Sequence, residues 1–243
     1  MRPCALVTGA TRRVGRAIAL ELARAGHDIV VTWHTDASGA ESLGADVRAL
    51  GVQCRALQLD LGSDAVDSAA HALAGIDAID ALVLNAAAWR SSAWDAPMAE
   101  AALDAFRVNA LGPVRLVQAL TPMLKASKVR GGASVVAVGD AHAQGTPVRG
   151  YGAYMMSKAA LHQAVQQMAV ELAPAVRVNG VLPGVVAWPE DMPSERREAL
   201  LARIPLQRAG EPDDVARLVR FLCAEAPFVT GALIPVDGGR SLR

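Results

Sequence analysis

The sequence is poor in cysteine and has no excess charge of either sign. Its three cysteines, Cys4, Cys54 and Cys223, are scattered and lack any CxxC spacing. They predict neither a disulfide framework nor a zinc site, and we expect no metal. Lys+Arg and Asp+Glu total 24 each. A balanced chain lacks the basic surface with which proteins bind nucleic acids or anionic membranes, which favours a small-molecule partner.

Long hydrophobic runs and leader-like segments are also missing. No stretch reaches about eighteen uninterrupted apolar residues, and the apolar run at residues 4–7 begins too early for a signal peptide. We therefore expect no membrane span and a cytoplasmic location. With 52% hydrophobic and 20% charged residues, and no linker or internal repeat, the chain can bury a large core. We expect a single domain over residues 1–243.

Short apolar runs rich in Val, Ile and Leu predict strands that are buried on both faces. They occupy residues 5–8, 29–33, 54–59, 81–84, 134–138, 176–181 and 233–236. Apolar residues at helical spacing predict helices at residues 14–25, 41–50, 103–123, 154–172 and 213–223. This alternation predicts the α/β class, with one doubly wound parallel sheet covered by helices. Ligands of such sheets bind beyond the carboxyl ends of the strands.

The first predicted strand runs into a glycine-containing turn and then a helix. The turn reads Thr8-Gly9-Ala10-Thr11-Arg12-Arg13-Val14-Gly15. Gly9 and Gly15 let the backbone approach a pyrophosphate, and the helix N-terminus offers it free N–H groups. An ordinary strand-to-helix turn is the alternative, which the position after the first strand of an alternating chain disfavours. The predicted phosphate site consists of Gly9, Arg12, Arg13, Val14 and Gly15.

The residues that follow the second predicted strand favour NADPH. A carboxylate at the strand tip would bind the ribose 2′-hydroxyl of NAD, whereas this strand ends at His34 without an acid. Arg12 can supply the bidentate cation that a 2′-phosphate prefers, although Asp36 lies close enough to oppose it.

Polar and small residues recur at the ends of the third and fourth predicted strands. Asp60, which Leu61 follows, can accept a hydrogen bond from the adenine amino group. Asn85 and Ala86 leave room for a cofactor to lie across them. Such residues are common turn formers, and they count here because they fall at the same edge of the sheet.

Tyr154 and Lys158 lie four residues apart, so both side chains project from one face of a helix. An ammonium favours the phenolate, so we expect Lys158 to lower the pKa of Tyr154 and make it a proton donor to the atom that becomes negative as a hydride arrives. Lys158 can also hold the ribose hydroxyls of a nicotinamide cofactor. A surface helix pair is the alternative. Tyr151 has Met155 at the matching position and cannot replace Tyr154.

Together these motifs resemble the short-chain dehydrogenase/reductase family in order and spacing along the whole chain. The residues that carry the resemblance are Thr8-Gly9, Gly15, Asn85-Ala86, Asn109, Tyr154, Lys158, Pro183-Gly184 and Asp237-Gly238-Gly239. The resemblance implies a Rossmann-type fold, a nicotinamide cofactor that Pro183 and Gly184 help to bind, and usually a homotetramer. It also implies that Asn109 supports a water relay leading to Lys158.

Two departures from the family pattern resemble its pteridine reductase branch. Arg13 stands where the typical loop has a glycine, and Asp140 replaces the typical catalytic serine. His34, Trp89 and the segment 188–193, which begins at Trp188, are further likenesses to that branch.

Asp140 also favours this branch on chemical grounds. A serine hydroxyl donates a hydrogen bond to a substrate carbonyl, whereas an ionised carboxylate can only accept. A pterin offers N–H and amino donors, so Asp140 can accept from it or orient Tyr154 while hydride adds to a ring C=N bond. Arg13 can meet the pterin oxygen, and Trp89 can stack on the planar ring. The alternatives are that Asp140 caps the loop 140–143, and that the tryptophans are core or subunit-contact residues.

The sequence thus predicts an NADPH-dependent reductase of a pterin or folate, with residues 185–210 folding over the substrate as a lid. The predicted substrate contacts are Arg13, Trp89, Asp140, Tyr154 and Trp188. One alternative is a general carbonyl reductase acting on oxoacyl or sugar-like ketones. Another is a non-catalytic nucleotide sensor, against which the set Asn109, Tyr154 and Lys158 argues. Apolar residues on more than one side of the helix at 154–172 agree with a homotetramer.

Overall fold

A single parallel sheet organises the chain. The computed structural model describes residues 2–95, 97–188 and 192–242. Its sheet has seven strands in the order β3-β2-β1-β4-β5-β6-β7, and every pair is parallel. The strands are β1 (Cys4–Val7), β2 (Asp28–Trp33), β3 (Cys54–Gln58), β4 (Ala81–Leu84), β5 (Ala133–Val138), β6 (Val176–Pro183) and β7 (Leu233–Val236). The predicted α/β doubly wound sheet of the Rossmann type is confirmed.

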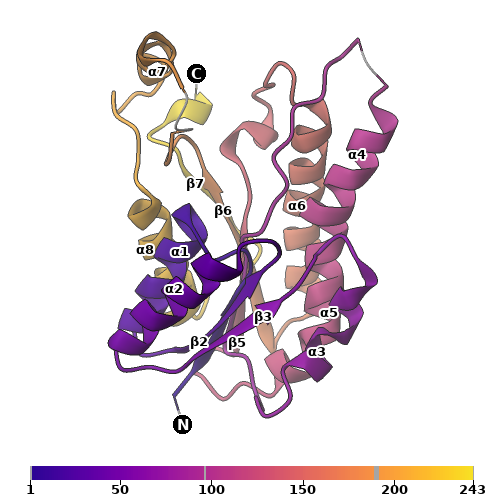
Figure 1. Cartoon of the computed structure of the whole chain (residues 1–243), viewed down its shortest axis with the longest axis vertical. Coiled ribbons are helices and arrows are strands. Elements are labelled where there is room, and N and C mark those ends of the chain that lie inside the picture. The colour runs from indigo at the N-terminus through magenta and orange to yellow at the C-terminus, as the bar shows by residue number, and fades with distance from the viewer. Residues whose placement is uncertain (1, 96, 189–191, 243) are drawn as a thin grey trace.

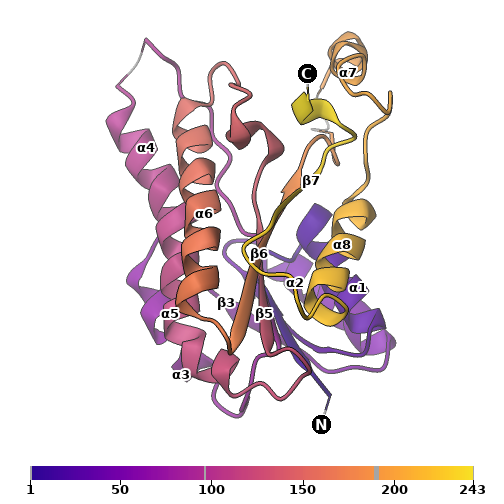
Figure 2. The same ribbon diagram turned by 180° about the vertical axis from the view of Figure 1, so that it is seen from behind.

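Helices cover both faces of the sheet. They are α1 (Arg13–Arg24), α2 (Ala37–Ala49), α3 (Ala69–Ala72), α4 (Ala99–Phe106), α5 (Gly112–Lys125), α6 (Gly152–Glu171), α7 (Ser194–Leu201) and α8 (Pro212–Ala224). Short turns join them: the 3₁₀ turns η1 (Asp64–Ser68), η3 (Ala141–Gln144) and η4 (Arg240–Leu242), and the π-helical turn η2 (Arg107–Leu111). Helices α1, α2 and α8 lie on one side of the sheet and α3 to α6 on the other (Figure 1), as the view from behind also shows (Figure 2).

The core consists of two apolar layers separated by the sheet. Successive strand residues point to opposite faces, so Val136 and Val138 of β5 pack toward α1 and α8, whereas Val135 and Ala137 pack toward α5 and α6. All six residues of β5 are buried. This two-sided burial explains why the strands appear in the sequence as continuous apolar runs.

The helix predicted over residues 103–123 is wrong in one respect, because the structure divides it into α4, η2 and α5. Residues 107–111 wind as a π turn, and α5 begins at Gly112 with Pro113 in its first turn. Proline has no N–H to donate to the preceding turn, so it is tolerated at a helix start. A side chain at Gly112 would also collide with the carbonyl of Leu61.

Helix α7 and the segment η1–α3 lie outside the predicted helices. Helix α7 has no buried residue, so it carries no apolar stripe that periodicity could detect. The segment η1–α3 is too short to show a helical period. Among the described residues, no helix combines the length and apolar character that a bilayer crossing requires.

Candidate active site

The glycine loop lies where β1 ends, directly beside the end of β4. Gly9 has φ 61°, a left-handed conformation, and a Cβ on it would lie 2.9 Å from Ala86. Gly15, in the first turn of α1, is buried against the carbonyl of Gly9 and the side-chain amide of Asn85. Both positions therefore require glycine, and both keep the backbone open at the helix N-terminus.

Thr8 and Asn85 fix this loop to β4. The Thr8 hydroxyl accepts hydrogen bonds from the backbone N–H groups of Asn85 (2.9 Å) and Ala86 (3.0 Å) and donates to the carbonyl of Val83 (3.2 Å). The Asn85 amide donates to the carbonyls of Thr8 and Gly9, each at 3.0 Å. The amide of Asn85 thus holds the loop in place, and Ala86 forms the floor beside Gly9.

The loop fits the pyrophosphate of a dinucleotide. Arg12 is the N-cap residue of α1, its side chain makes no cap hydrogen bond, and no acidic residue stands in the first turn. The first N–H groups of the helix are therefore left to an anion. Arg12 and Arg13 are exposed, and Val14 is half-buried. Arg13 has φ 49°, which explains why glycine is usual at its position.

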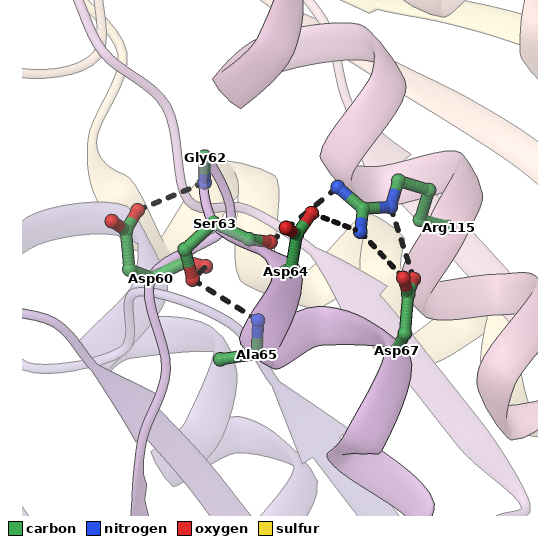
Figure 3. A network of polar contacts seen from close by, with 7 residues as sticks. All are labelled: Asp60, Gly62, Ser63, Asp64, Ala65, Asp67 and Arg115. Atoms are coloured by element: carbon green, nitrogen blue, oxygen red, sulfur yellow. Dashed lines mark hydrogen bonds and ion pairs between the residues drawn. The ribbon is translucent and has the colours of Figure 1, made fainter.

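The end of β2 faces the end of β3. The Nε2 atom of His34 lies 3.8 Å from Oδ2 of Asp60, whose Oδ1 accepts from the N–H of Gly62 at 2.8 Å. Asp60 lies at one side of a polar network in which Arg115 binds Asp64 and Asp67 (Figure 3).

Asp60 and His34 are thus brought together at the predicted adenine side of the site. Leu61, which follows Asp60, is buried. The Asp60 carboxylate keeps Oδ2 on the side of His34, away from Gly62, so it can accept from an adenine amino group.

Asp36 caps α2 and lies beside the glycine loop. Its carboxylate accepts from the N–H of Gly39 at 2.9 Å. That bond, a hydrogen bond from Thr11 and the nearby charge of Arg12 hold the pKa of the Asp36 carboxyl below its usual value. Arg12 therefore faces a carboxylate, which weakens its attraction for a 2′-phosphate.

Tyr154 and Asp140 are in direct contact. The Tyr154 hydroxyl donates to Oδ2 of Asp140 at 3.1 Å, and Oδ1 of Asp140 accepts from the backbone N–H of His142 at 2.8 Å. Asp140 thus caps the turn η3 and engages Tyr154 at the same time. Burial opposes ionisation of Asp140, but the hydrogen bonds from His142 and Tyr154 outweigh it and lower the pKa of the carboxyl.

The expected lowering of the Tyr154 pKa is wrong. Burial, and next the Asp140 carboxylate, raise the pKa of the Tyr154 phenol well above its usual value. Lys158 lies over the Tyr154 ring, with Nζ 5.9 Å from the ring centre. Its Nζ donates to the carbonyl of Val138 at 2.8 Å, and burial lowers the pKa of Lys158 to about 8.

Asn109 is fully buried in the π turn η2. Its Oδ1 accepts from the N–H of Ala88 at 2.7 Å, and its Nδ2 donates to the carbonyl of Ala88 and to the Ser157 hydroxyl, each at 2.9 Å. Asn109 therefore ties the loop after β4 to the helix that carries Tyr154 and Lys158. The water relay that the family resemblance implies stays a prediction.

Each of the two tryptophans contacts a neighbouring side chain. Trp89 is 55% exposed and stacks on Tyr151, with ring centres 4.9 Å apart and planes at 10°. Trp188 lies 6.0 Å from the guanidinium of Arg197 in α7. Pro183 is the last residue of β6, and Gly184 follows it and packs against Asp237. Residues 189–191 of the predicted lid lie outside the described residues.

Several residues of the site were not among the predicted ones. Thr8 contacts Asn85, and Ser157 contacts Asn109. Both contacts depend on the fold, so the sequence alone does not indicate them. His142 donates from Nδ1 to Oδ1 of Asp140 at 3.0 Å. Its position two residues after an acid at a strand end is the signal that could have indicated it.

The comparisons identify the class of protein. The family model described as Enoyl-(Acyl carrier protein) reductase matches residues 9–241. Its match spans the glycine loop, Asp140 and the Tyr154–Lys158 pair. The chain belongs to the short-chain dehydrogenase/reductase family.

Individual relatives carry several different activities. A 3-oxoacyl-[acyl-carrier-protein] reductase from Pseudomonas aeruginosa is 36% identical over 97% of this chain and 96% of its own. Pteridine reductase 1 from Leishmania tarentolae is 34% identical over 99% of this chain and 96% of its own. The crystal structure of an acetoin dehydrogenase from Salmonella typhimurium has a TM-score of 0.88 and 32% identity, covering 100% of this chain and 97% of that one.

The chain is therefore an oxidoreductase of a family that uses nicotinamide cofactors. The identities to the oxoacyl reductase and to the pteridine reductase are similar, so the resemblance to the pteridine branch is not singled out by the relatives.

Proposed function

We propose that the protein is an NADPH-dependent reductase of pterin-type substrates, of the dihydropterin and dihydrofolate class. The observation that carries the proposal is the Asp140 carboxylate, whose Oδ2 contacts the Tyr154 hydroxyl. Because Asp140 is held ionised by its hydrogen bonds, it accepts hydrogen bonds and donates none. A heterocycle with N–H and amino donors complements it, and a ketone oxygen does not.

In the proposed reaction, some residues bind the substrate and cofactor, and Tyr154 delivers a proton. A nicotinamide cofactor, held by the glycine loop and Lys158, would supply the hydride for the carbon of a ring C=N bond. Tyr154 delivers its proton to the ring nitrogen, so that one C–H and one N–H bond form. Lys158 compensates the phenolate that remains, and an N–H donor of the substrate takes the place of the Tyr154 hydroxyl at Asp140. This exchange removes the hydrogen bond to Asp140, which adds to burial and to the Asp140 charge in raising the pKa of Tyr154.

NADPH is the proposed cofactor because an exposed arginine of the glycine loop is available to its 2′-phosphate. Arg12 offers a guanidinium group to that phosphate, and His34 rather than an acid follows β2. The Asp36 carboxylate opposes the binding of a 2′-phosphate and so limits the preference for NADPH over NADH.

A second candidate function is reduction of a ketone, such as a 3-oxoacyl thioester. The relatives favour it, because 3-oxoacyl-[acyl-carrier-protein] reductases of several bacteria match this chain, one of them at 36% identity, and the pteridine reductase matches at 34%. In that reaction Asp140 would hinder binding of the substrate oxygen, so Asp140→Ser should raise activity.

The test uses purified protein, NADPH or NADH, and four substrates: dihydrobiopterin, dihydromonapterin, dihydrofolate and a 3-oxoacyl thioester. The pterin proposal expects oxidation of NADPH with at least one of the first three, and its loss in Asp140→Ser and Tyr154→Phe. Oxidation with the thioester alone, increased by Asp140→Ser, would establish the second candidate. No turnover, with tight NADPH binding unaffected by Tyr154→Phe, would point to a nucleotide sensor.

We also propose that the protein forms a homotetramer. Large apolar side chains are exposed on neighbouring elements of one side of the molecule, with Leu103 57%, Phe106 43% and Met156 53% accessible. Contiguous exposed apolar residues commonly mark subunit contacts. Sedimentation analysis of the protein and of Phe106→Glu tests this proposal.

A further inference from the structure

The Asp140 carboxylate has a second side-chain partner besides Tyr154. His142 donates from Nδ1 to Oδ1 at 3.0 Å, and its backbone N–H donates to the same oxygen at 2.8 Å. The backbone bond alone would suffice to cap the turn η3. The side chains of Asp140 and His142 are 19% and 14% exposed, so the ring–carboxylate bond is sheltered from water.

Arg240 determines which nitrogen of His142 carries the proton. Its Nε donates to Nε2 of His142 at 2.6 Å. A guanidinium can only donate, so Nε2 must accept, and the ring hydrogen must lie on Nδ1, where it points at Asp140. Arg240, His142, Asp140 and Tyr154 therefore form one continuous chain of hydrogen bonds, with all donors oriented toward the carboxylate.

A turn after β7 presents Arg240 to His142. The Asp237 carboxylate accepts from the backbone N–H groups of Gly239 (2.9 Å) and Ser241 (2.7 Å), which closes the turn η4. Gly238, which lies between Asp237 and Gly239, has φ 64°. This gives a physical role to the motif Asp237-Gly238-Gly239, which the proposed reaction does not otherwise use. Arg240 also donates from Nη1 to the carbonyl of Leu200 in α7 at 3.3 Å.

The chain of bonds fixes the direction of both carboxylate oxygens. Oδ1 receives two donors from His142, so Oδ2 is the oxygen left for Tyr154 and the substrate. Without the ring donor, Oδ1 would keep only the backbone bond from His142, and rotation of the carboxylate about the Cβ–Cγ bond would be less restricted. Charged groups near Asp140 on other elements are Lys158 of α6 and Arg240 of η4, and neither of these donates to it directly.

We propose that His142 and Arg240 are positioning residues of the active site, which act by orienting the Asp140 carboxylate toward Tyr154 and the substrate. The bond of Arg240 to Leu200 extends this chain to the segment predicted to cover the substrate. The inference rests on the proposed function only for the choice of assay substrate.

The kinetic test compares His142→Leu with His142→Gln, and Arg240→Met with Arg240→Lys. Leucine fills similar space but leaves the carboxylate without its side-chain donor, which we expect to lower kcat/KM about 10- to 100-fold. Glutamine can donate to Asp140 and accept from Arg240, so it should retain kcat/KM within about threefold of the wild type. Arg240→Met should lower kcat/KM about tenfold and Arg240→Lys less.

Controls separate positioning from damage to the fold. Arg203→Met removes an exposed charge near Arg240 and should leave kcat/KM within about twofold of the wild type. The KM for NADPH should change little in all four variants, because the glycine loop is untouched. A loss in His142→Leu that His142→Gln shares equally, or a kcat/KM above half of the wild-type value in His142→Leu, would overturn the proposal.

A spectroscopic readout tests the geometry without turnover. The nitrogen shifts of the His142 ring, assigned by their loss in His142→Gln, should show hydrogen on Nδ1 and none on Nε2 in the wild type. In Arg240→Met the hydrogen should move partly to Nε2. A wild-type ring protonated on Nε2 alone would refute the proposal, even if His142→Leu fails to fold. If the wild type reduces none of the substrates, the proposed function fails, and the tautomer still decides the positioning claim.

Discussion

Burial of the Lys158 ammonium makes a quantitative prediction about stability and pH. Lys158 is 3% exposed, and its Nζ donates to the carbonyl of Val138. Burial lowers the pKa of Lys158 from 10.5 to about 8, although Asp140 opposes the shift. The folded protein therefore disfavours the charged lysine relative to the unfolded chain. We expect Lys158→Met to remove a pH-dependent cost from the folded state.

The size and sign of the effect follow from proton linkage. Because the folded-state pKa lies below the unfolded-state value, the unfolded chain binds more protons between pH 8 and 10.5, and the stability contribution of this group rises with pH across that window. A shift from 10.5 to about 8 corresponds to about 3 kcal/mol, of which about 2.5 kcal/mol is realised between pH 7 and pH 10. Between pH 7 and pH 10, the free energy of unfolding of the wild type should therefore rise by that amount relative to that of Lys158→Met.

The assay is urea unfolding of both proteins at pH 7, 8, 9 and 10 in the same buffer. Both proteins contain Tyr154, so the contribution of its titration cancels in the difference between the two free energies of unfolding. The lost bond to Val138 adds a constant to this difference, and comparing the difference between pH values removes that constant. Lys125→Met, which removes an exposed ammonium at the end of α5, controls for the loss of one charge. A difference between wild type and Lys158→Met that stays constant within about 0.5 kcal/mol from pH 7 to pH 10 would refute the reasoning.

Three further perturbations test other parts of the structure. Arg177 is buried and donates to the carbonyls of Gly131, Leu222, Cys223 and Ala226, so Arg177→Met should lower the free energy of unfolding by about 3 kcal/mol, measured by urea unfolding. Asp36→Asn removes the carboxylate beside Arg12 and should raise the ratio of kcat/KM for NADPH over NADH about fivefold; an unchanged ratio would show that Arg12 does not contact the 2′-phosphate. Gly15→Ala places a methyl group against the Gly9 carbonyl and should weaken NADPH binding at least tenfold or so, measured by fluorescence titration.

The strands were predictable because their burial on both faces leaves a local signal. Strands β4 and β7 have the predicted bounds, and the others differ by one or two residues at their ends. The helices with an apolar face were predictable for the same reason. Helix α7 was not, because its sequence has no residue that packs on the core.

The chemistry of the site was only partly predictable. The four-residue spacing of Tyr154 and Lys158 is local, so the sequence places them on one face of a helix. The environment that sets the pKa of Tyr154 is not local, because Asp140 approaches from the end of β5 and burial depends on the whole fold. The contact of His142 with Arg240 joins residues 98 positions apart. No spacing rule relates a strand-end turn to the segment that follows β7.

The π turn η2 sets the rotation of one helix relative to the next, and this rotation determines where the Asn109 side chain points. A π turn holds one residue more than an α-helical turn, so it advances the following helix by about 100° relative to a regular helix of the same length. Deleting one residue from 107–111 would restore regular winding and rotate α4 against α5 by that angle. Asn109 would then leave Ala88 and Ser157, although every side chain of the site remained in the sequence. The rotation of α4 relative to α5 therefore depends on the number of residues in the turn. Substitutions alone do not change that number.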